Sequence, residues 1–365
     1  MKSAKRIVML LLIASMLVAL TACGSTAAEP EAAAQPATET TEAAPAAPVG
    51  DPITMVVGLG VPTNHFEYEA MVKMKEYVEK ESNGMLIMDL YPDTALGDDF
   101  EVMELIKTGD AHMCVPGMVD SGNVAKACYL LSYPMLFPDN LDAINAIQDS
   151  EVFREILDTI EDSGYISLGT TIFGARCTMN TVHPISSLDD YKNLKIRTTL
   201  TPVKLKFYEA IGAAPIAMAW GETVPALQQG VIDALDNPLP TLTANFVHEI
   251  ADYLTLDSTE FTLMNLMLGK DFFYGLPEEY QQILRDGARI AQLSTRESYQ
   301  TEYDKALALM EEYGTQISVL SEDARAEMRE VAMEIAKEHA AENGMSELFD
   351  KLLAEIDTQA AKFAS

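Results

Sequence analysis

The feature that most constrains the fold of this chain is a regular alternation of strand-like and helix-like segments that begins at Ile53. The apolar segments ITMVVGLGV, MLIMDLY and AHMCVPG have the length of strands, and they are separated by a helix that opens at Asn64 and by another from Asp99 to Lys107. A βαβαβ order favours a parallel sheet with helices on its faces. The sequence therefore predicts an α/β fold.

A second unit of the same kind follows a predicted helix from Leu141 to Asp162. The segment YISLGTTIFGARCT is predicted as a strand ending in the cation Arg176, and KNLKIRT, AAPIAMAW and VIDALDNP are predicted as further strands with helices between them. Residues 51–365 amount to about 315 residues, which is enough for two domains of typical size.

The last third of the chain is predicted to be mainly helical. A helix from Leu239 to about Ile250 precedes two strand-like runs, Tyr253 to Leu256 and Phe261 to Leu268, that return the chain. A continuous helical pattern then runs from Pro277 to about Tyr313, and a helix of that length could lie across two domains. A short strand, ISVL, and two amphipathic helices ending near Phe363 complete the prediction.

The N-terminus reads as an export signal. Lys2, Lys5 and Arg6 precede a 14-residue apolar run, which is shorter than the roughly 20 residues that a bilayer span requires. Residues 1–22 are therefore predicted to be a signal peptide. Leu20-Thr21-Ala22-Cys23 resembles the bacterial lipoprotein box, which implies a palmitate-bearing lipid anchor on Cys23; simple cleavage nearby is the alternative.

The next segment is predicted to be a tether. Residues 23–50 consist almost entirely of Ala, Pro, Thr and Glu after the cysteine, a composition that cannot bury a core and favours an extended, disordered chain. We expect it to hold the folded part outside the cell membrane, anchored to the membrane surface and not crossing it.

The charge of the chain excludes one class of partner. The formal net charge is −31, and removal of the three N-terminal cations makes it −34. So acidic a chain argues against nucleic acid as a partner. It does not exclude an anionic ligand, because surface charge is screened over a Debye length of about 8 Å and a buried arginine can outweigh it.

Motifs of covalent chemistry are missing from the sequence. It contains no G-x-S-x-G, H-E-x-x-H or G-x-x-x-x-G-K motif and no clustered metal-ligand spacing, and its five histidines are dispersed. Cys114, Cys128 and Cys177 form no C-x-x-C pair and are interpreted as small buried hydrophobic residues. We therefore predict no enzyme activity, no metal and no cofactor.

The stretch from Lys192 to Pro238 carries the candidate ligand-binding residues. Arg197 lies near the carboxyl end of a predicted strand, where open α/β sheets bind their ligands, and Arg176 ends another. A guanidinium can hold a carboxylate through two hydrogen bonds. The alternative for each arginine is a salt bridge within the protein.

Two further residues follow Arg197 at strand ends. Trp220 is the only tryptophan and comes just after a predicted strand, where it either joins the core or stacks against a ligand. Asn237 ends the next strand and is either a turn residue or a hydrogen-bond donor to a bound carboxylate.

These residues stand in motifs that resemble a known family. NLKIR followed by GAAPIAMAWGETVPALQQGVIDALDNP is similar to the signature of the solute-binding receptors of tripartite ATP-independent periplasmic (TRAP) transporters, the dicarboxylate-binding-protein family. GLGVPTNHFEYEAM, SNGMLIMDLYPDTALGDD, IKTGDAHMCV, YPMLF and GLPEEYQQIL also resemble the corresponding parts, so the likeness covers about residues 51–340.

The resemblance implies a periplasmic-binding-protein-like fold, in which two α/β domains are joined by a hinge, crossing strands and a long spanning helix. Domain I is expected at residues 51–172 plus 263–302, and domain II at residues 173–262 plus 303–365. The implied ligand is an organic acid, and the implied partners are the membrane subunits of a TRAP permease.

The resemblance also implies roles for individual residues. Arg197 takes the main carboxylate clamp, Arg176 the second arginine and Asn237 the amide that binds the same carboxylate. The remaining implied ligand-binding residues are one pocket wall and three positions on the opposite domain: Trp220, Asp99, Asn64 and His65.

The departures from the family pattern narrow the range of candidate ligands. Val115 to Met118 stands where sialic-acid receptors have an acid, which argues against sialic acid; Leu235-Asp236 replaces the usual Gln-Glu and leaves the polarity of the pocket open. Trp220 and Met218 favour a fairly apolar acid. The alternatives are an ABC-type solute-binding lipoprotein, a ligand-sensing receptor for an organic acid and a secreted lipoprotein enzyme.

Overall fold

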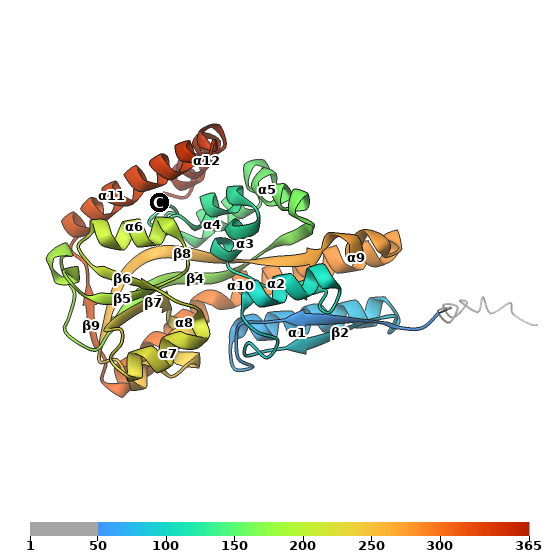
Figure 1. The fold of residues 1–365 in the computed structure, drawn as a ribbon, viewed down its shortest axis with the longest axis horizontal. Helices are drawn as coiled ribbons and strands as arrows, with labels where there is room; N and C mark the ends of the chain where they lie inside the picture. The colour runs from blue at the N-terminus through green and yellow to red at the C-terminus, as the bar shows by residue number, and fades with distance from the viewer. Residues whose placement is uncertain (1–49, 365) are drawn as a thin grey trace, which may run out of the picture. The chain divides into compact units, whose positions relative to one another are not determined.

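One mixed nine-stranded sheet organises the folded part of the chain (Figure 1). The computed structural model describes residues 50–364, so the predicted signal peptide, Cys23 and the predicted tether up to residue 49 lie outside the described residues. The strand order is β2-β1-β3-β8-β4-β7-β5-β6, and β9 pairs with β8.

A first parallel group forms one end of the sheet. It consists of β1 (Ile53–Gly58), β2 (Leu86–Tyr91) and β3 (Met113–Cys114), connected by α1 (Phe66–Glu81) and α2 (Asp99–Thr108). α2 begins with a capping box, in which the backbone N–H of Glu101 donates to the Asp98 side chain and that of Asp98 donates to Glu101, each over 2.9 Å. The predicted βαβαβ order is confirmed here, although β3 is much shorter than predicted.

A second parallel group forms the other end. It consists of β5 (Lys195–Thr198), β6 (Ala214–Ala217) and β7 (Ala234–Pro238), with α6 (Pro202–Ala210), α7 (Trp220–Gln228) and α8 (Leu239–Ala244). β5 pairs in parallel with both β6 and β7. Pro202 occupies the first turn of α6, where its missing N–H is not needed.

Two long antiparallel strands, β4 (Tyr165–Asn180) and β8 (Tyr253–Gly269), join the two groups and cross the middle of the sheet (Figure 1). β8 pairs with β3 at one end, and β4 pairs with β7 at the other. The prediction of two separate strands between Tyr253 and Leu268 was wrong, because the chain continues as one strand through the polar residues between them. Arg176 likewise lies inside β4 and not at its end.

The ladder between β4 and β8 is irregular. The register shifts between Ser167 and Thr170, between Ile172 and Gly174, and between Arg176 and Thr178. Gly174 has a φ of 121°, which favours glycine, and a Cβ there would lie 2.2 Å from the Tyr299 ring. The bulge therefore depends on a residue without a side chain.

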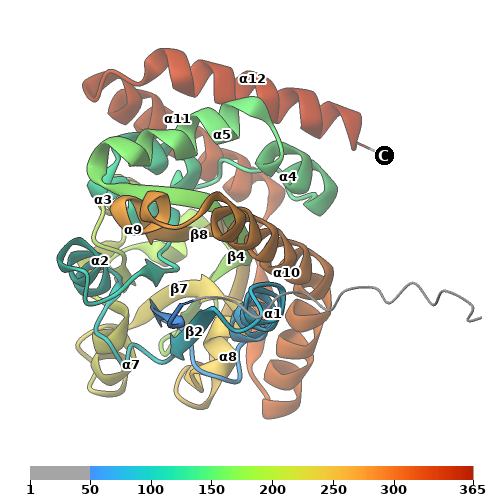
Figure 2. The same ribbon diagram turned by 90° about the vertical axis from the view of Figure 1, so that its right-hand side faces the viewer.

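The helix α10 (Glu278–Tyr313) confirms the prediction of one long helix, since it has 36 residues. It packs against α1 and β4 and also against α8, so it contacts elements of both ends of the sheet (Figure 2). Gly287 allows the approach of α1, because a Cβ at that position would lie 2.8 Å from Val78 Cγ2.

The predicted helix from Leu141 to Asp162 is wrong as a single element. It is divided into α4 (Leu141–Gln148), α5 (Glu151–Asp158) and a 3-10 turn, η2 (Thr159–Ser163), and the Ser150 side chain caps α5 by accepting from Phe153 N. A serine offers this cap as an alternative to continuing the helix.

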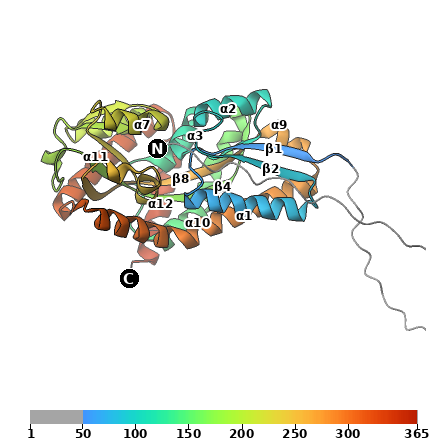
Figure 3. The same ribbon diagram turned by 90° about the horizontal axis from the view of Figure 1, so that it is seen from below.

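The C-terminal part of the chain adds α11 (Glu322–Glu342) and α12 (Ser346–Lys362), both labelled in Figure 3. The C-terminal helices are close to the prediction, and they contact both predicted domains: α12 packs on α4 and α5, and α11 packs on α6. The domain boundaries themselves remain a prediction. The elements not yet named are α3 (Met118–Val124), η1 (Lys126–Ser132), η3 (Leu188–Tyr191), η4 (Val247–Glu249), α9 (Lys270–Gly275) and β9 (Gln316–Val319).

Candidate functional site

The candidate site is a cavity of about 200 Å³ at the carboxyl ends of the parallel strands. It is lined by the loops that follow β1, β3, β5 and β6 and by the end of β7, so both parallel groups contribute to it. Ligand sites in open α/β sheets occur in this position. Five of the seven predicted ligand-binding residues line it: Arg176, Arg197, Asn237, Trp220 and Asp99.

Arg197 is a buried cation without a carboxylate partner among residues 50–364. Its side chain is 4 % exposed, and its Nε and Nη2 donate to the carbonyl of Met218 over 3.1 and 2.8 Å. The guanidinium also lies 5.7 Å from the centroid of the Trp220 ring. Burial and then the charge of Arg176 lower the pKa of Arg197 to about 10, and the arginine nevertheless remains charged at neutral pH.

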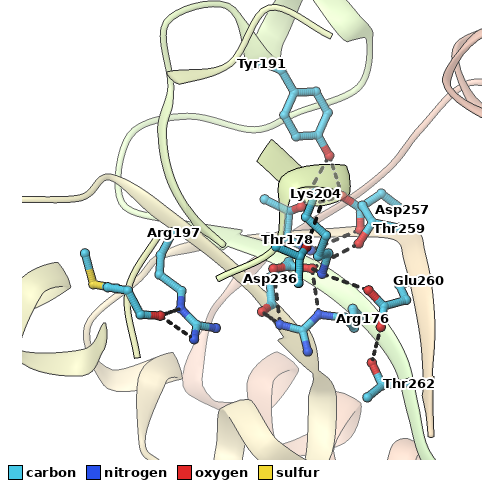
Figure 4. A network of polar contacts seen from close by, with 12 residues as sticks. Arg176, Thr178, Tyr191, Arg197, Lys204, Asp236, Asp257, Thr259, Glu260 and Thr262 are labelled. Atoms are coloured by element: carbon cyan, nitrogen blue, oxygen red, sulfur yellow. Dashed lines mark hydrogen bonds and ion pairs between the residues drawn. The ribbon is translucent and has the colours of Figure 1, made fainter. Parts of the chain in front are cut away.

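Arg176 has a different environment, because it is already ion-paired (Figure 4). Its Nε lies 2.6 Å from Asp236 Oδ2, and its Nη2 donates to Asp236 Oδ1 over 3.2 Å and to the Asp236 carbonyl. Lys204 Nζ reaches the same carboxylate at 2.7 Å and Glu260 Oε2 at 3.0 Å. The internal salt bridge that the sequence left open for Arg176 is therefore present, although Arg176 also lines the cavity.

The pKa values of this cluster follow from its geometry. Burial alone raises the pKa of Asp236, but Arg176 and Lys204 outweigh burial and hold that pKa far below its ordinary value. Two cations and two carboxylates balance one another in the cluster of Arg176, Lys204, Asp236 and Glu260. Arg197 thus has no ion-pair partner of its own beside this balanced network, although Asp236 and Asp120 favour its charged form.

Asn237 and Trp220 complete this wall of the cavity. Asn237 is 4 % exposed, and its Oδ1 is buried without a hydrogen-bond partner in the described chain. Trp220 is the first residue of α7 and is half-buried, with its ring packed against the apolar cluster that includes Cys177 and Leu235. Trp220 therefore packs on the core and also borders the cavity, and its stacking against a ligand stays a prediction.

The opposite wall carries three acids, of which Asp98 is the N-cap of α2. Asp99 is the first residue of α2, and Asp120, which the sequence reasoning missed, belongs to α3. Burial and then Asp120 raise the pKa of Asp99 well above its ordinary value. Burial raises the pKa of Asp120 to about 6 against the opposing effect of Arg197. The sequence signal that could have identified Asp120 is its position just after the β3 loop, at the same sheet edge as Arg197.

Asn64 and His65 do not line the cavity. Asn64 is exposed and donates through Nδ2 to the Ala244 carbonyl over 3.3 Å. His65 is the N-cap of α1, where its Nδ1 accepts from Glu67 N over 3.2 Å, and its Nε2 lies 3.1 Å from Thr241 Oγ1. The cap predicted at Asn64 is thus one residue later. Burial lowers the pKa of His65 to about 3, so its ring is neutral.

The cysteines and the potential metal ligands among the described residues form no second site. Cys114, Cys128 and Cys177 are free and buried, as predicted. Within residues 50–364, no group of three or more His, Cys, Asp or Glu side chains is arranged to hold a metal ion.

Comparison with protein families gives a match to one family model over most of the chain. The model is described as bacterial extracellular solute-binding protein, family 7, and it matches residues 57–343. Among curated relatives, the ectoine-binding periplasmic protein TeaA of Halomonas elongata is 26 % identical over 304 residues, which are 80 % of this chain and 88 % of that protein. The C4-dicarboxylate-binding periplasmic protein DctP of Rhodobacter capsulatus is 26 % identical over 270 residues, 73 % of this chain and 80 % of that protein.

Solved structures share the fold. The sugar acid binding protein DctPAm of Advenella mimigardefordensis, in complex with galactonate, superposes with a TM-score of 0.81 at 24 % identity, covering 85 % of this chain and 99 % of that chain. A TRAP periplasmic solute-binding protein from Sulfitobacter with bound β-D-galacturonate gives a TM-score of 0.78 at 19 % identity, over 83 % and 99 %. The predicted periplasmic-binding-protein-like α/β fold is confirmed.

Proposed function

The chain belongs to family 7 of the bacterial extracellular solute-binding proteins, the receptors of TRAP transporters, and from this premise we propose that it captures an organic acid and delivers it to a TRAP permease. The family consists of binding receptors and not of enzymes. Relatives named for C4-dicarboxylates, ectoine and sugar acids support a small carboxylate as the ligand.

The observation that carries the proposal is the state of Arg197. The Arg197 guanidinium is 4 % exposed, borders the cavity and has no carboxylate partner among the described residues. Because a buried charge is costly without a partner, such a group favours the binding of an anion. Its Nε and Nη2 bond to Met218, whereas its Nη1 makes no hydrogen bond within residues 50–364. A ligand carboxylate that accepts from Arg197 would supply the missing partner.

Arg176 and Asn237 are proposed as the second and third contacts. Asp236 engages Nε and Nη2 of Arg176, which leaves Nη1 to donate to the ligand from a fixed position. The amide of Asn237 faces the same cavity and would donate through Nδ2. Charge-assisted hydrogen bonds contribute about 1.5 to 3 kcal/mol each. Two such bonds would provide much of the roughly 8 kcal/mol of a micromolar affinity.

We propose that the receptor acts outside the cytoplasmic membrane and is held there by a lipid on Cys23. The proposal rests on the sequence Leu20-Thr21-Ala22-Cys23. In the described part of the chain, no helix has the length and apolar character needed to cross a membrane. Mass spectrometry of the membrane fraction tests the anchor, because a Cys23→Ala variant should lose both the acyl chains and the membrane association.

Ligand binding is tested by a thermal-shift and calorimetry panel on the purified receptor. The panel contains C4-dicarboxylates, ectoine, galactonate and glucuronate. A ligand present at 100 times its Kd should stabilise the protein by about 2.7 kcal/mol. Arg197→Ala should weaken binding at least tenfold, whereas Arg329→Ala, an exposed arginine of α11, should bind like the parent. Equal affinity of Arg197→Ala and the parent would overturn the clamp.

Delivery to the permease is tested by uptake. Cells that carry the cognate permease should take up the bound acid when they express the parent, and should lose uptake when they express Arg197→Ala. Uptake that persists after deletion of the receptor gene, together with a lost transcriptional response to the acid, would favour a ligand-sensing receptor in its place.

A further inference from the structure

The cavity wall that faces Arg197 carries acidic side chains that form no ion pair within residues 50–364. Asp99 and Asp120 both line the cavity, and neither forms an ion pair or a hydrogen bond to another side chain of residues 50–364. A hydrogen bond from the Gly117 backbone lowers the pKa of Asp99. Asp98 and Glu67 add to the negative potential, while Arg197 and Arg176 oppose it from the other wall.

A metal ion does not account for these acids, because the residues that the structure describes include no third ligand arranged to join them. A ligand does account for them. Asn237, which is 4 % exposed with an unpartnered Oδ1, and the unpaired Arg197 both border the same cavity. The acids therefore share a site in which protein groups already lack partners.

Four neutral polar side chains of the cavity are engaged within the protein, whereas Thr199 Oγ1 and Asn237 Oδ1 are buried without a partner in the described chain. Thr241 bonds to His65 at 3.1 Å, Asn245 donates to the Thr241 carbonyl over 2.8 Å, and Asn123 accepts from the Tyr129 hydroxyl. Thr262 donates to Glu260 over 3.2 Å. A ligand with one cation would find two carboxyl groups here that lack a side-chain partner among the described residues.

We propose that the ligand is zwitterionic: an organic acid that carries a protonated amine, with its carboxylate on Arg197 and its ammonium group between Asp99 and Asp120. This inference rests on the proposed function. An ammonium group there would offset the repulsion between the two carboxylates and would supply the hydrogen-bond donors that both lack. Burial is the first cause of the raised pKa of both acids, and Asp120 raises the pKa of Asp99 further; a cation between the two carboxyls would favour the charged form of each.

The test compares ligands that differ only in the cationic group. Calorimetry at pH 7 uses glycine, 3-aminopropanoate, 4-aminobutanoate and 5-aminopentanoate, each against the hydroxy acid and the unsubstituted acid of the same length. One amino acid of the series should bind roughly ten- to a hundredfold tighter than its hydroxy counterpart, the range of one charge-assisted contact. That preference should vanish in Asp99→Asn with Asp120→Asn.

The controls separate this inference from the proposed function. Asp350→Asn, an exposed acid of α12, should keep the preference, and circular dichroism should show that the double amide variant is folded. If acids of the carboxylate panel bind and no amino acid binds more tightly than its hydroxy counterpart, the proposal of a zwitterionic ligand is wrong, and the proposal of a carboxylate receptor stands. If neither the panel nor the series binds, both are wrong. A preference that survives in the double amide variant would place the cation elsewhere.

Discussion

Arg176 on β4 is bound to Asp236 on the neighbouring strand β7, with 2.6 Å between Nε and Oδ2. This pair, with Lys204 Nζ 2.7 Å from the same Oδ2, balances the charge of Arg176 and fixes its guanidinium, whereas its Nη1 makes no hydrogen bond within residues 50–364. Arg197 keeps its full charge in the same cavity without such a partner. The two arginines are therefore unequal, and the predictions below depend on that difference.

Removal of the charge at Arg197 should stabilise the ligand-free protein while it weakens binding. Arg197→Met keeps an unbranched apolar stem and removes a buried cation whose pKa is lowered to about 10. The gain should be of order 2 kcal/mol, reduced by the lost bonds to Met218. Urea unfolding without ligand measures it. A variant markedly less stable than the parent would show that Arg197 is compensated in the free protein.

Asp236→Asn should destabilise the protein strongly. The substitution leaves Arg176 and Lys204 as neighbouring buried cations, and breaking a buried pair costs about 3 to 5 kcal/mol. The double variant with Lys204→Met restores the balance of charge. Its loss of stability should be smaller than the sum of the two single losses, by at least about 1 kcal/mol. Additive losses would mean that the two residues do not interact.

Glu67 should make stability fall with rising pH. Burial raises the pKa of Glu67 to about 8, against the opposing bond from Thr171 Oγ1 at 2.8 Å, whereas the unfolded value is about 4.5. Below pH 4.5 both states are protonated and no penalty exists. The penalty grows as pH rises from 4.5 to 8 and is complete above pH 8.

Glu67→Gln should therefore gain stability over the parent as pH increases from 5 to 9, by about 4 kcal/mol at the alkaline end. Chemical unfolding across this range measures the difference. Glu76→Gln, an exposed acid on the same helix, should show no such trend. A pH-independent difference for Glu67→Gln would mean that the buried carboxyl titrates normally.

Gly287→Ala tests the packing of α10 on α1. An added Cβ would lie 2.8 Å from Val78 Cγ2 and 3.3 Å from Met74 Cγ, and overpacking of this kind costs about 1 to 3 kcal/mol. Gly275→Ala at the end of α9 meets nothing within 4 Å and serves as the control. Thermal unfolding should show a lower Tm for Gly287→Ala alone. Equal Tm values would show that the helices yield without cost.

The sequence predicts what depends on local pattern. The position of Arg197, Trp220 and Asn237 around one cavity follows from parallel strands whose carboxyl ends meet at one edge. The 36-residue α10 follows from uninterrupted helical spacing. The helical spacing of α10 is contained within one segment, and the strand ends that carry the three cavity residues recur at regular intervals along the sequence.

What the sequence did not predict depends on contacts between distant segments. The partner of Arg176 lies 60 residues away, and strand pairing brings the two together. The sequence did not single out Asp120, because many acids in so acidic a chain face solvent. The turn after β3 places this acid in the cavity. The polar stretch in β8 resembled a break, although buried partners such as Asp257, which accepts from Thr178 N over 3.0 Å, keep it in the strand.

The irregular ladder between β4 and β8 has a mechanical consequence. A regular ladder resists bending, and each register shift removes bonds that stiffen it, so we expect these crossing strands to bend most easily at the three shifts. One of them is the step from Arg176 to Thr178. The arginine beside the cavity thus stands on a flexure of the sheet, and a force applied to its guanidinium acts directly on the backbone that bends most easily.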